Sequence, residues 1–574
     1  MRVSDYVIQF LKNNYNIDTF FTVSGGGCIF LIDSLGAENI KYIATHHEQA
    51  AAIAAEGYAR INNSLAACVV TSGPGATNAI TGALCSWLDS IPVIILSGQV
   101  NKEMTTNYTE LPLRQFGDQE FNIVSSIKNM TKYAIQVNSP DDIRYHLEKA
   151  CKLATTGRPG PVWLDIPLNV QSANIDPELL KGFDENIDVP SASSTTIEFV
   201  VNKLKEAKNP LLIVGNGIRL SGGVESILEM LKMTNIPTIS AVNGNDIVTK
   251  DYKQYYGRFG THAQICANKL ISECDFLLSI GSRLYVRQIG YSFDSFAKQA
   301  FKIYVDIDKN ELDKPTLYPD LKIQSDAKIF IDNLLKYDLP KTNADWIKRC
   351  DELYSAPKVL DRHRNNPNYI SHYHFIEQLE KHIPPNYHIV TSDGSANVVT
   401  MQVLNLQTNQ RLITNTGCAP MGYGLPAAIG ASVKHNIICI EGDGSLHLNV
   451  HELQTMKHYN LPIKLILLNN QGYLSIKITQ NTFFNKKYVA SEGSSGVTFP
   501  KFEKIFEAYE IPYFKINTNN DIDSVLNAFF NTDGPCACEV FTDPNECHEP
   551  KVMAKLDKDG KFIPGKLEDI QWIQ

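Results

Sequence analysis

The chain has 574 residues and a formal net charge of −9, and 43% of its residues are hydrophobic, a composition typical of globular proteins of about three to four domains. The sequence contains no long run of like charge, which argues against nucleic acid as a partner and against a polybasic membrane anchor. Its apolar runs, such as 91–96 and 463–468, are far shorter than the ~20 residues of a membrane helix. Because the N-terminus also lacks the apolar core of a signal peptide, we expect a cytoplasmic protein without membrane contact.

Twelve cysteines are scattered along the chain without a repeating spacing. Cys536 and Cys538 stand two residues apart on a predicted strand, where both side chains point to the same face and a disulfide between them is strained. We expect buried, reduced thiols rather than disulfides or a structural zinc site.

Three regions repeat one pattern, in which a short apolar strand is followed by a glycine-rich turn and a helix. This alternation predicts an α/β fold with three doubly wound parallel-sheet domains. In chain order, the strands fall in 68–71, 162–167, 210–217, 275–281, 304–308, 389–391, 437–440 and 465–468. We place the domains at 1–175, 190–340 and 365–545, with a linker at 191–196, a polar tail at 546–574 and a turn at Asp559-Gly560.

Two stretches of the predicted helices, 50–59 and 424–431, are rich in alanine and glycine. Small side chains allow a helix to approach a neighbouring helix or a ligand closely. Close packing alone is the simpler interpretation of both stretches.

The motif with the clearest chemistry lies in the third domain. Gly442-Asp443-Gly444-Ser445 follows the strand at 437–440, and Asn469-Asn470-Gln471-Gly472 follows the strand at 465–468. Both therefore lie at carboxyl ends of strands, where open α/β sheets bind ligands. The glycines allow the backbone N–H groups of Gly444 and Ser445 to turn toward a phosphate. The side-chain oxygens of Asp443 and Asn470 suit Mg²⁺, which shares its six oxygen ligands with phosphates and water.

Either half of this motif alone is weak evidence for a ligand site. The two halves at this spacing along the chain together resemble the metal and diphosphate motif of thiamine-diphosphate enzymes. The resemblance covers nearly the whole chain and is closest to the acetolactate synthase branch. It implies a pyrimidine-binding N-terminal domain, a central nucleotide-fold domain and a diphosphate-binding C-terminal domain. It also implies thiamine diphosphate and Mg²⁺ as cofactors, with Asp443, Asn470 and the backbone oxygen of Gly472 as metal ligands.

The segment Thr45-His46-His47-Glu48-Gln49-Ala50-Ala51 is similar to the family's activating-glutamate motif. The resemblance implies that Glu48 meets N1′ of the cofactor's aminopyrimidine and shifts that ring to its imino form, so that the thiazolium C2 proton can leave. This chemistry needs a carboxyl group in a water-poor site. Glu56 is the competing candidate, and we interpret it as a structural residue paired with Arg60 at i,i+4.

The resemblance assigns further roles to residues in four glycine-rich segments. Gln119 is expected to line the substrate cavity, Met421 to hold the cofactor bent between its two rings, and the Ala419 carbonyl to accept from the aminopyrimidine. The complete set of expected cofactor contacts is Gly25, Gly26, Gly27, Pro74, Asn78, Gly394, Ser395, Asn397, Ala419, Met421, Gly442, Gly444, Ser445, Asn470, Gly472, Tyr473 and Leu474.

The sequence departs from acetolactate synthases at several places. Ser24 replaces the proline of the family's Pro-Gly-Gly turn, and Ala396 stands where those enzymes carry a histidine. The stretch 473–480 lacks their Arg-Gln-Trp segment, whose tryptophan shapes the acceptor site. These changes resemble acetolactate-synthase-like proteins of bacterial surface-sugar pathways, some of which add a two-carbon unit to a nucleotide-linked keto sugar.

The central domain raises the question of a second cofactor. Gly215-Asn216-Gly217, Gly281-Ser282-Arg283 with Arg287, and Asp306-Ile307-Asp308 resemble the flavin site of acetolactate synthases. The Met-His pair of that site is Arg258-Phe259 here. The sequence leaves open whether this domain binds FAD or is purely structural.

The activity implied is decarboxylation of a 2-keto acid, with pyruvate as the expected substrate, followed by attack of the two-carbon enamine on an acceptor carbonyl. Gln119 and the stretch 473–480 are expected to set the identity of the acceptor. Alternatives are two-carbon transfer to a nucleotide-linked keto sugar, a simple decarboxylase, a flavin oxidase of pyruvate, and an inactive cofactor-binding paralogue. Because the family's glutamate and diphosphate sites belong to different subunits, the resemblance also implies at least a homodimer.

Overall fold

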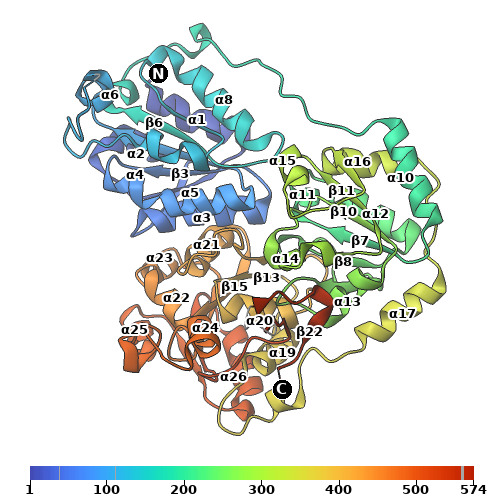
Figure 1. Ribbon diagram of the computed structural model, residues 1–574. Helices are drawn as coiled ribbons and strands as arrows, with labels where there is room; N and C mark the ends of the chain where they lie inside the picture. The colour runs from blue at the N-terminus through green and yellow to red at the C-terminus, as the bar shows by residue number, and fades with distance from the viewer. Residues whose placement is uncertain (38, 110, 557–561, 574) are drawn as a thin grey trace.

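The computed structural model describes every residue except 38, 110, 557–561 and 574 (Figure 1), so the turn predicted at Asp559-Gly560 lies outside the described residues. The described chain contains three six-stranded sheets, and every strand pair within each of them is parallel. Helices flank these sheets, which confirms the prediction of three doubly wound α/β domains.

The N-terminal sheet has the strand order β2-β1-β3-β4-β6-β5. Its strands are β1 (Thr19–Thr22), β2 (Lys41–Ala44), β3 (Ala66–Val70), β4 (Val93–Gln99), β5 (Tyr133–Gln136) and β6 (Val162–Pro167). Its helices are α1 (Val3–Tyr15), α2 (Ile29–Leu35), α3 (Glu48–Asn62), α4 (Pro74–Asn78), α5 (Ile80–Asp89), α6 (Thr106–Thr109), α7 (Ile123–Ile127), α8 (Ile143–Thr155) and α9 (Leu168–Gln171).

Strand β3 shows why the central strands of these sheets are apolar at every position. Cys68 and Val70 belong to one buried cluster, and Ala67 and Val69 belong to another. Successive side chains of a strand point to opposite faces, so β3 has a hydrophobic core on each side. A strand in this position needs apolar residues at every place rather than at alternate ones.

The central sheet has the order β12-β11-β10-β7-β8-β9, which is the dinucleotide-binding order when counted from β7. Its strands are β7 (Pro210–Val214), β8 (Thr238–Ser240), β9 (Tyr255–Arg258), β10 (Phe276–Ile280), β11 (Phe301–Asp306) and β12 (Leu321–Gln324). The helices of this region are α10 (Ser194–Glu206), α11 (Asn216–Leu220), α12 (Val224–Thr234), α13 (Ile265–Glu273), α14 (Val286–Ile289), α15 (Lys309–Asp313), α16 (Ala327–Leu334) and α17 (Ala344–Tyr354).

The C-terminal sheet has the order β14-β13-β15-β16-β18-β17, the same relative order as the N-terminal sheet. Its strands are β13 (Tyr387–Thr391), β14 (Leu412–Ile413), β15 (Asn436–Gly442), β16 (Ile463–Asn469), β17 (Tyr513–Ile516) and β18 (Cys536–Phe541). The helices of this region are α18 (Asp361–Arg364), α19 (His372–His382), α20 (Ser395–Val403), α21 (Gly424–Ser432), α22 (Asp443–Leu448), α23 (Glu452–His458), α24 (Leu474–Phe484), α25 (Phe502–Ala508) and α26 (Ile522–Asn531).

The predicted linker at 191–196 is only partly irregular. A long connection crosses from the N-terminal domain to α10 (Figure 1), but α10 already begins at Ser194. The Ser193 hydroxyl accepts a hydrogen bond from the Thr196 N–H at 3.2 Å, and such N-caps start a helix within a polar stretch. The prediction was therefore wrong for residues 194–196.

The polar tail is folded against the central domain. Strand β19 (Lys551–Val552) pairs with β22 (Ile570–Gln571), and β20 (Lys555–Leu556) pairs with β21 (Phe562–Ile563). The Val552 N–H donates to the Thr261 carbonyl at 2.9 Å, and Asn268 Nδ2 donates to the Leu567 carbonyl at 3.1 Å. These bonds attach the end of the chain to α13 and the loop before it.

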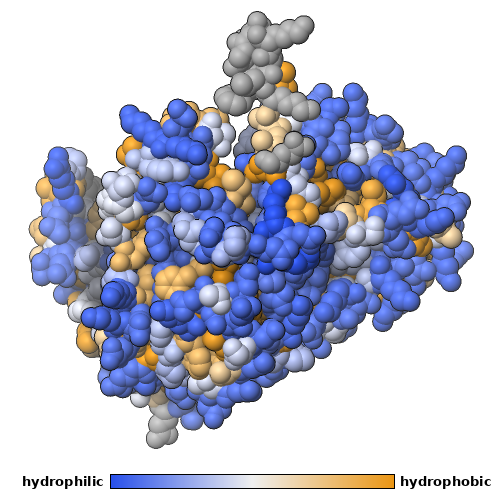
Figure 2. Space-filling model, turned by 90° about the horizontal axis from the view of Figure 1, so that it is seen from below, coloured by the Kyte–Doolittle hydropathy of each residue, from blue (hydrophilic) through white to orange (hydrophobic). Residues whose placement is uncertain are grey.

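All twelve cysteines are free thiols, and Cys536 and Cys538 are both buried on β18. Across the part of the chain that the structure describes, no helix has the length and apolar character needed to cross a membrane. Seen from below, the surface is mainly hydrophilic and is interrupted by hydrophobic areas (Figure 2). Large exposed apolar side chains occur in the loop after β4 and around α24: Met104, Tyr108, Leu111, Leu113, Phe116, Phe121, Ile476, Phe483, Phe484 and Val489.

The two small-residue helices pack against each other. Helix α3 of the N-terminal domain lies on α21 of the C-terminal domain (Figure 1). A Cβ atom at Gly57 would lie 2.3 Å from the Ala427 carbonyl oxygen, and one at Gly430 would lie 1.8 Å from the Ala54 carbonyl oxygen. Only glycine permits this backbone approach, so both stretches serve close packing between domains.

We predict that Gly430→Ala lowers the thermal midpoint of unfolding, because the new methyl group forces two buried helices apart at a cost of about 1–3 kcal/mol. Differential scanning fluorimetry measures the effect. Gly493→Ala is the matched control, since its Cβ would meet only Thr498 Cγ2 at 3.7 Å. Equal midpoints for the two variants would contradict the prediction.

Candidate active site

Three loops meet at the carboxyl edge of the N-terminal sheet, where β1, β2 and β3 end. The Gly27 N–H donates to Thr71 Oγ1 at 3.0 Å. A Cβ at Gly25 would lie 2.5 Å from Thr71 Cβ, and one at Gly27 would lie 2.7 Å from Ser72 Oγ. The turn that contains Gly25, Gly26 and Gly27 therefore packs directly on the loop that follows β3.

Glu48 is the first residue of α3 and lies at the same edge. Its N-cap is His47, whose Nδ1 accepts from the Gln49 N–H at 3.1 Å. Glu48 is half-buried, and its Oε2 accepts a hydrogen bond from Asn78 Nδ2 at 3.0 Å. A Cβ at Gly75 would lie 3.4 Å from Glu48 Oε1. The structure thus brings Glu48 together with the loop 71–78, including Pro74 and Asn78.

Glu56 has a different environment, two turns further along α3. It is fully buried, and Arg60 Nε donates to its Oε1 at 3.1 Å. The prediction of a structural i,i+4 pair with Arg60 is confirmed.

Gln119 reaches the edge of this site through its backbone. It has a φ of 55°, and its carbonyl oxygen would lie 2.4 Å from a Cβ at Gly73, whose own φ of 56° favours glycine. The Gln119 side chain is exposed in the described chain. Its expected place on a substrate cavity stays a prediction.

The second half of the candidate site lies at the carboxyl edge of the C-terminal sheet. Asp443 Oδ2 accepts from the N–H groups of Asn470 and Gly472 at 3.1 and 3.3 Å, and its Oδ1 accepts from the Gly444 N–H at 2.7 Å. The Gly444 N–H, predicted to turn toward a phosphate, is thus bonded to the neighbouring carboxylate in this structure. Burial raises the pKa of Asp443 to about 7, although these backbone N–H groups act in the opposite direction.

The chemistry of these groups fits a hard divalent cation. Asn470 Oδ1 is buried without a hydrogen-bond partner among the described residues, and an unpaired buried acceptor is unfavourable. No cluster of three or more His, Cys, Asp or Glu side chains suited to a metal occurs in the described ranges. One carboxylate beside an amide oxygen is the donor set of an ion that shares its ligands with phosphate and water, as Mg²⁺ does.

Met421, Gly444 and Tyr473 converge next to Asp443. A Cβ at Gly444 would lie 2.4 Å from Tyr473 Cε1 and 3.2 Å from Met421 Cε. Ser445 Oγ accepts from the Gly422 N–H at 2.8 Å, so the loop of Met421 is tied to the residues that follow Gly442. Met421 is half-buried, and Leu474 is buried at the start of α24. The structure therefore joins the predicted residues of three separate segments.

Ala419 lies on the same loop and has a left-handed backbone, with a φ of 52°. This conformation is unfavourable for a residue with a Cβ by roughly 1–2 kcal/mol. Its persistence therefore requires support from neighbouring groups.

The loop after β13 contacts a residue of the polar tail that the sequence did not indicate. Gly394 has a φ of 68°, a conformation that favours glycine. Ser395 Oγ and His548 Nε2 share a hydrogen bond of 2.8 Å, and Asn397 Oδ1 is buried without a partner among the described residues. Burial lowers the pKa of His548 to about 3, so the ring is neutral. His548 comes from the tail, and no local motif marks it.

In the stretch 473–480, Tyr473 is the N-cap of α24 and residues 474–480 form its first two turns. Lys477 is buried, its Nζ donates to the Pro544 carbonyl at 2.9 Å, and it pairs with Glu492 at 3.1 Å. Its charge is thus neutralised within its own domain.

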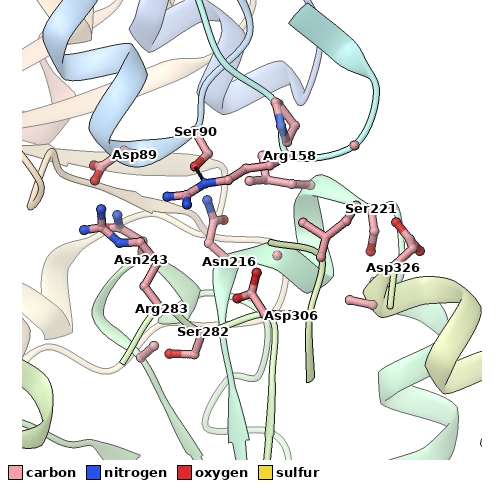
Figure 3. Close-up of a pocket in the computed structure, with 18 of the residues that line it drawn as sticks. Asp89, Ser90, Arg158, Asn216, Ser221, Asn243, Ser282, Arg283, Asp306 and Asp326 are labelled. Atoms are coloured by element: carbon pink, nitrogen blue, oxygen red, sulfur yellow. Dashed lines mark hydrogen bonds between the residues drawn. The ribbon is translucent and has the colours of Figure 1, made fainter. Parts of the chain in front are cut away.

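A polar cavity of about 310 Å³ lies between the N-terminal and central domains (Figure 3). Arg158 faces Asn216 and Asp306 across it, and Arg158 Nε donates to Ser90 Oγ at 2.9 Å. Burial raises the pKa of Asp306 to about 6. The cavity is lined by seven residues of the predicted flavin segments, namely Asn216, Gly217, Gly281, Ser282, Arg283, Asp306 and Ile307.

Arg258 and Phe259, which replace the Met-His pair, are not among the residues that line this cavity. Arg258 Nη1 donates to the Met401 and Leu404 carbonyls at 2.9 and 2.8 Å, and Phe259 is buried in the core of the central domain. These two residues therefore serve packing and attachment to the C-terminal domain.

Three family models match the chain in order along its length. Residues 1–125 match the thiamine pyrophosphate enzyme N-terminal TPP binding domain, 197–334 the central domain and 393–540 the C-terminal TPP binding domain. The matched ranges contain the N-terminal loops, the central sheet and the residues around Asp443 described above.

Several curated proteins are similar over nearly their whole length. The acetolactate synthase isozyme 2 large subunit of Escherichia coli K12 is 31% identical over 556 residues, 96% of this chain and 97% of that protein. The acetolactate synthase large subunit of Lactococcus lactis is 30% identical over 97% of this chain and 95% of that protein. A probable acetolactate synthase large subunit of Methanococcus aeolicus is 30% identical, with 92% and 90% covered.

Proposed function

The chain belongs to the thiamine pyrophosphate enzyme family, and we propose that it decarboxylates a 2-keto acid, pyruvate being the first to test, and joins the two-carbon product to an acceptor carbonyl. The observation that carries the proposal is the position of Glu48 against Asn78 and the 71–75 loop. A carboxyl group fixed by a hydrogen-bond donor at the carboxyl edge of the N-terminal sheet supports a role in proton transfer, which requires a positioned acid–base side chain.

The protein's own groups have three tasks in this reaction. Thiamine diphosphate, when bound, supplies the electron sink. Glu48 would hold a proton against the pyrimidine ring of the bound cofactor, and Asn78 fixes the Glu48 carboxyl group by donating to Oε2. Met421 and Ala419 would orient the cofactor from the loop before α21, and preorganisation of this kind lowers the barrier by avoiding rearrangement.

Asp443, Asn470 and Gly472 are the residues that we propose hold Mg²⁺ and, through it, the diphosphate. The unpartnered Asn470 Oδ1 and the buried Asp443 carboxylate support this assignment. A bound cation stabilises the ionised Asp443 against the burial that raises its pKa.

We predict that Glu48→Gln lowers CO₂ release from pyruvate by about 10²–10⁴-fold, the usual contribution of a general acid–base group. Steady-state assays with thiamine diphosphate and Mg²⁺ measure the change. Glu198→Gln on the exposed side of α10 is the control and should keep full activity. Unchanged turnover in the Glu48 variant would show that the proposed role of Glu48 is wrong.

We predict that thiamine diphosphate raises the thermal midpoint only when Mg²⁺ is present, and that Asp443→Ala abolishes this shift. Ligand binding at about 100 times the dissociation constant stabilises the folded state by about 2.7 kcal/mol, which a variant unable to bind cannot gain. Asp533→Ala, an exposed carboxylate of the same domain, should retain the shift. If thiamine diphosphate raised the thermal midpoint equally in the presence of EDTA, the proposed role of Mg²⁺ would be wrong.

The acceptor is proposed to differ from that of acetolactate synthases. Lys477 is paired and buried, and no tryptophan occurs at 473–480. A keto sugar linked to a nucleotide is the alternative acceptor. Product analysis by mass spectrometry with a panel of carbonyl acceptors separates it from a 2-keto acid acceptor, and aldehyde release alone would identify a simple decarboxylase.

We also propose that the enzyme acts as at least a homodimer. Glu48 bonds to Asn78 within the N-terminal domain, and Asp443 bonds to backbone groups within the C-terminal domain, so the two halves of the candidate site belong to different domains. The exposed apolar side chains of the loop after β4, among them Leu111 and Phe116, and of α24 suit contact with a second copy.

We propose that the cavity between the N-terminal and central domains does not bind a complete FAD molecule. Its volume of about 310 Å³ is at the lower end of the ~300–1,000 Å³ of ligand pockets, and Arg258 and Phe259 are committed to packing. We therefore derive no step through a flavin. The purified protein is expected to be colourless, and release of flavin on denaturation, measured by fluorescence, would contradict this.

A further inference from the structure

The loop of Ala419 and Met421 is anchored by a neighbouring side chain, that of Asn415. Asn415 Oδ1 accepts from the N–H groups of Cys418 and Ala419 at 3.0 and 3.3 Å. These bonds close a tight turn of the kind that Asn side chains form with backbone groups downstream. They hold the residue whose φ of 52° needs support.

The other end of the Asn415 amide reaches into the N-terminal domain. Asn415 Nδ2 donates to Glu56 Oε1 at 3.3 Å and to the Cys85 carbonyl at 3.1 Å. The side chain is buried, with 3% of its surface exposed. All the hydrogen-bonding capacity of one amide is therefore divided between two domains, with donors on one side and the acceptor on the other.

A buried charged cluster fixes the groups that Asn415 contacts. Arg60 pairs with Glu56 and with Asp89, whose Oδ2 lies 2.9 Å from Arg60 Nη2. The Tyr423 hydroxyl donates to Glu56 Oε2 at 2.6 Å. Because one cation faces two carboxylates in a buried site, the second negative charge depends on neutral donors such as Tyr423 and Asn415.

Asp89 holds the same loop directly. Its Oδ2 accepts from the Thr416 N–H at 3.2 Å, and its Oδ1 accepts from the Gly417 N–H at 3.0 Å. A Cβ at Gly417 would lie 2.6 Å from Leu88 Cβ, so the loop is pressed against the end of α5. Asp89 also lies on the wall of the cavity described above (Figure 3).

We propose that Asn415 is a positioning residue of the thiamine site, which transmits the fixed geometry of the Glu56–Arg60–Asp89 cluster to the backbone of Ala419. The inference rests on the proposed roles of Ala419 and Met421. A displacement of about 1 Å in such a loop is enough to lower the rate by about 10²-fold. Asn415 itself does not need to touch the cofactor for this effect.

The test compares Asn415→Ala with the wild-type enzyme by isothermal titration with thiamine diphosphate in the presence of Mg²⁺. We expect the dissociation constant to rise about tenfold or more, since the turn loses both bonds from Asn415 Oδ1 and Glu56 loses one of its donors. The near-ultraviolet circular dichroism of the bound cofactor at saturation should change as well.

The matched control is Asn268→Ala in the central domain. Asn268 is equally buried, its Oδ1 accepts from the Gly260 N–H at 3.0 Å, and its Nδ2 donates to the Gly260 and Leu567 carbonyls. This variant should lose thermal stability to a similar extent while its affinity for thiamine diphosphate stays within about twofold of wild type. The comparison separates positioning from general destabilisation.

Asp89→Asn provides a second variant that keeps the shape of the side chain and one acceptor oxygen. We expect it to weaken thiamine diphosphate binding by about threefold or more, because a charged hydrogen bond to Arg60 is lost. If Asn415→Ala does not fold, the affinity of Asp89→Asn for thiamine diphosphate tests the inference instead. Binding within about twofold of wild type by Asn415→Ala, or by Asp89→Asn if Asn415→Ala does not fold, would overturn the inference.

The binding measurement does not depend on which reaction is catalysed. If the wild-type enzyme binds thiamine diphosphate but releases no CO₂ from any 2-keto acid, the proposed function fails and the affinity comparison still decides the role of Asn415. If the wild-type enzyme turns over and the Asn415 variant binds normally, only the positioning role fails.

Discussion

The contact between α3 and α21 is the constraint on which the rest of the molecule depends. At Gly57 and Gly430 the two helices approach so closely that a Cβ atom on either one would collide with the backbone of the other. Helix α3 begins at Glu48 and α21 follows the loop of Met421. Their packing therefore sets where the edge of the N-terminal domain that contains Glu48 lies relative to the C-terminal domain of the same chain.

Burial at this junction creates an electrostatic problem that the structure resolves with many hydrogen bonds. Glu56 and Asp89 share Arg60 and receive further donors from a hydroxyl, a side-chain amide and two backbone N–H groups. Removing one partner from such a cluster is unfavourable, because a buried charge is left uncompensated. The loop that contains Ala419 is one of the partners, so its shape is coupled to the stability of the domain interface.

The Asp443 site follows the opposite principle. Its carboxylate is surrounded by backbone N–H groups rather than by a cation of the protein, and the neighbouring Asn470 Oδ1 has no partner in the described chain. Where the Arg60 cluster is complete within the protein, this site retains oxygen atoms suited to an external cation. The Arg60 cluster is therefore structural, whereas the Asp443 site has an unpaired oxygen atom available to a ligand.

The amino-acid sequence alone determined the three α/β domains, since apolar runs such as 66–70 followed by glycine turns leave few other folds. It also predicted Glu48, Asp443 and Asn470 as site residues, because the motifs that carry the family resemblance are local and lie at strand ends. Only the tertiary structure decided the role of His548, which reaches Ser395 across 153 residues of chain, and the burial of Lys477. Such contacts depend on how helices and the tail pack, and packing between distant segments leaves no periodic or local pattern in the sequence.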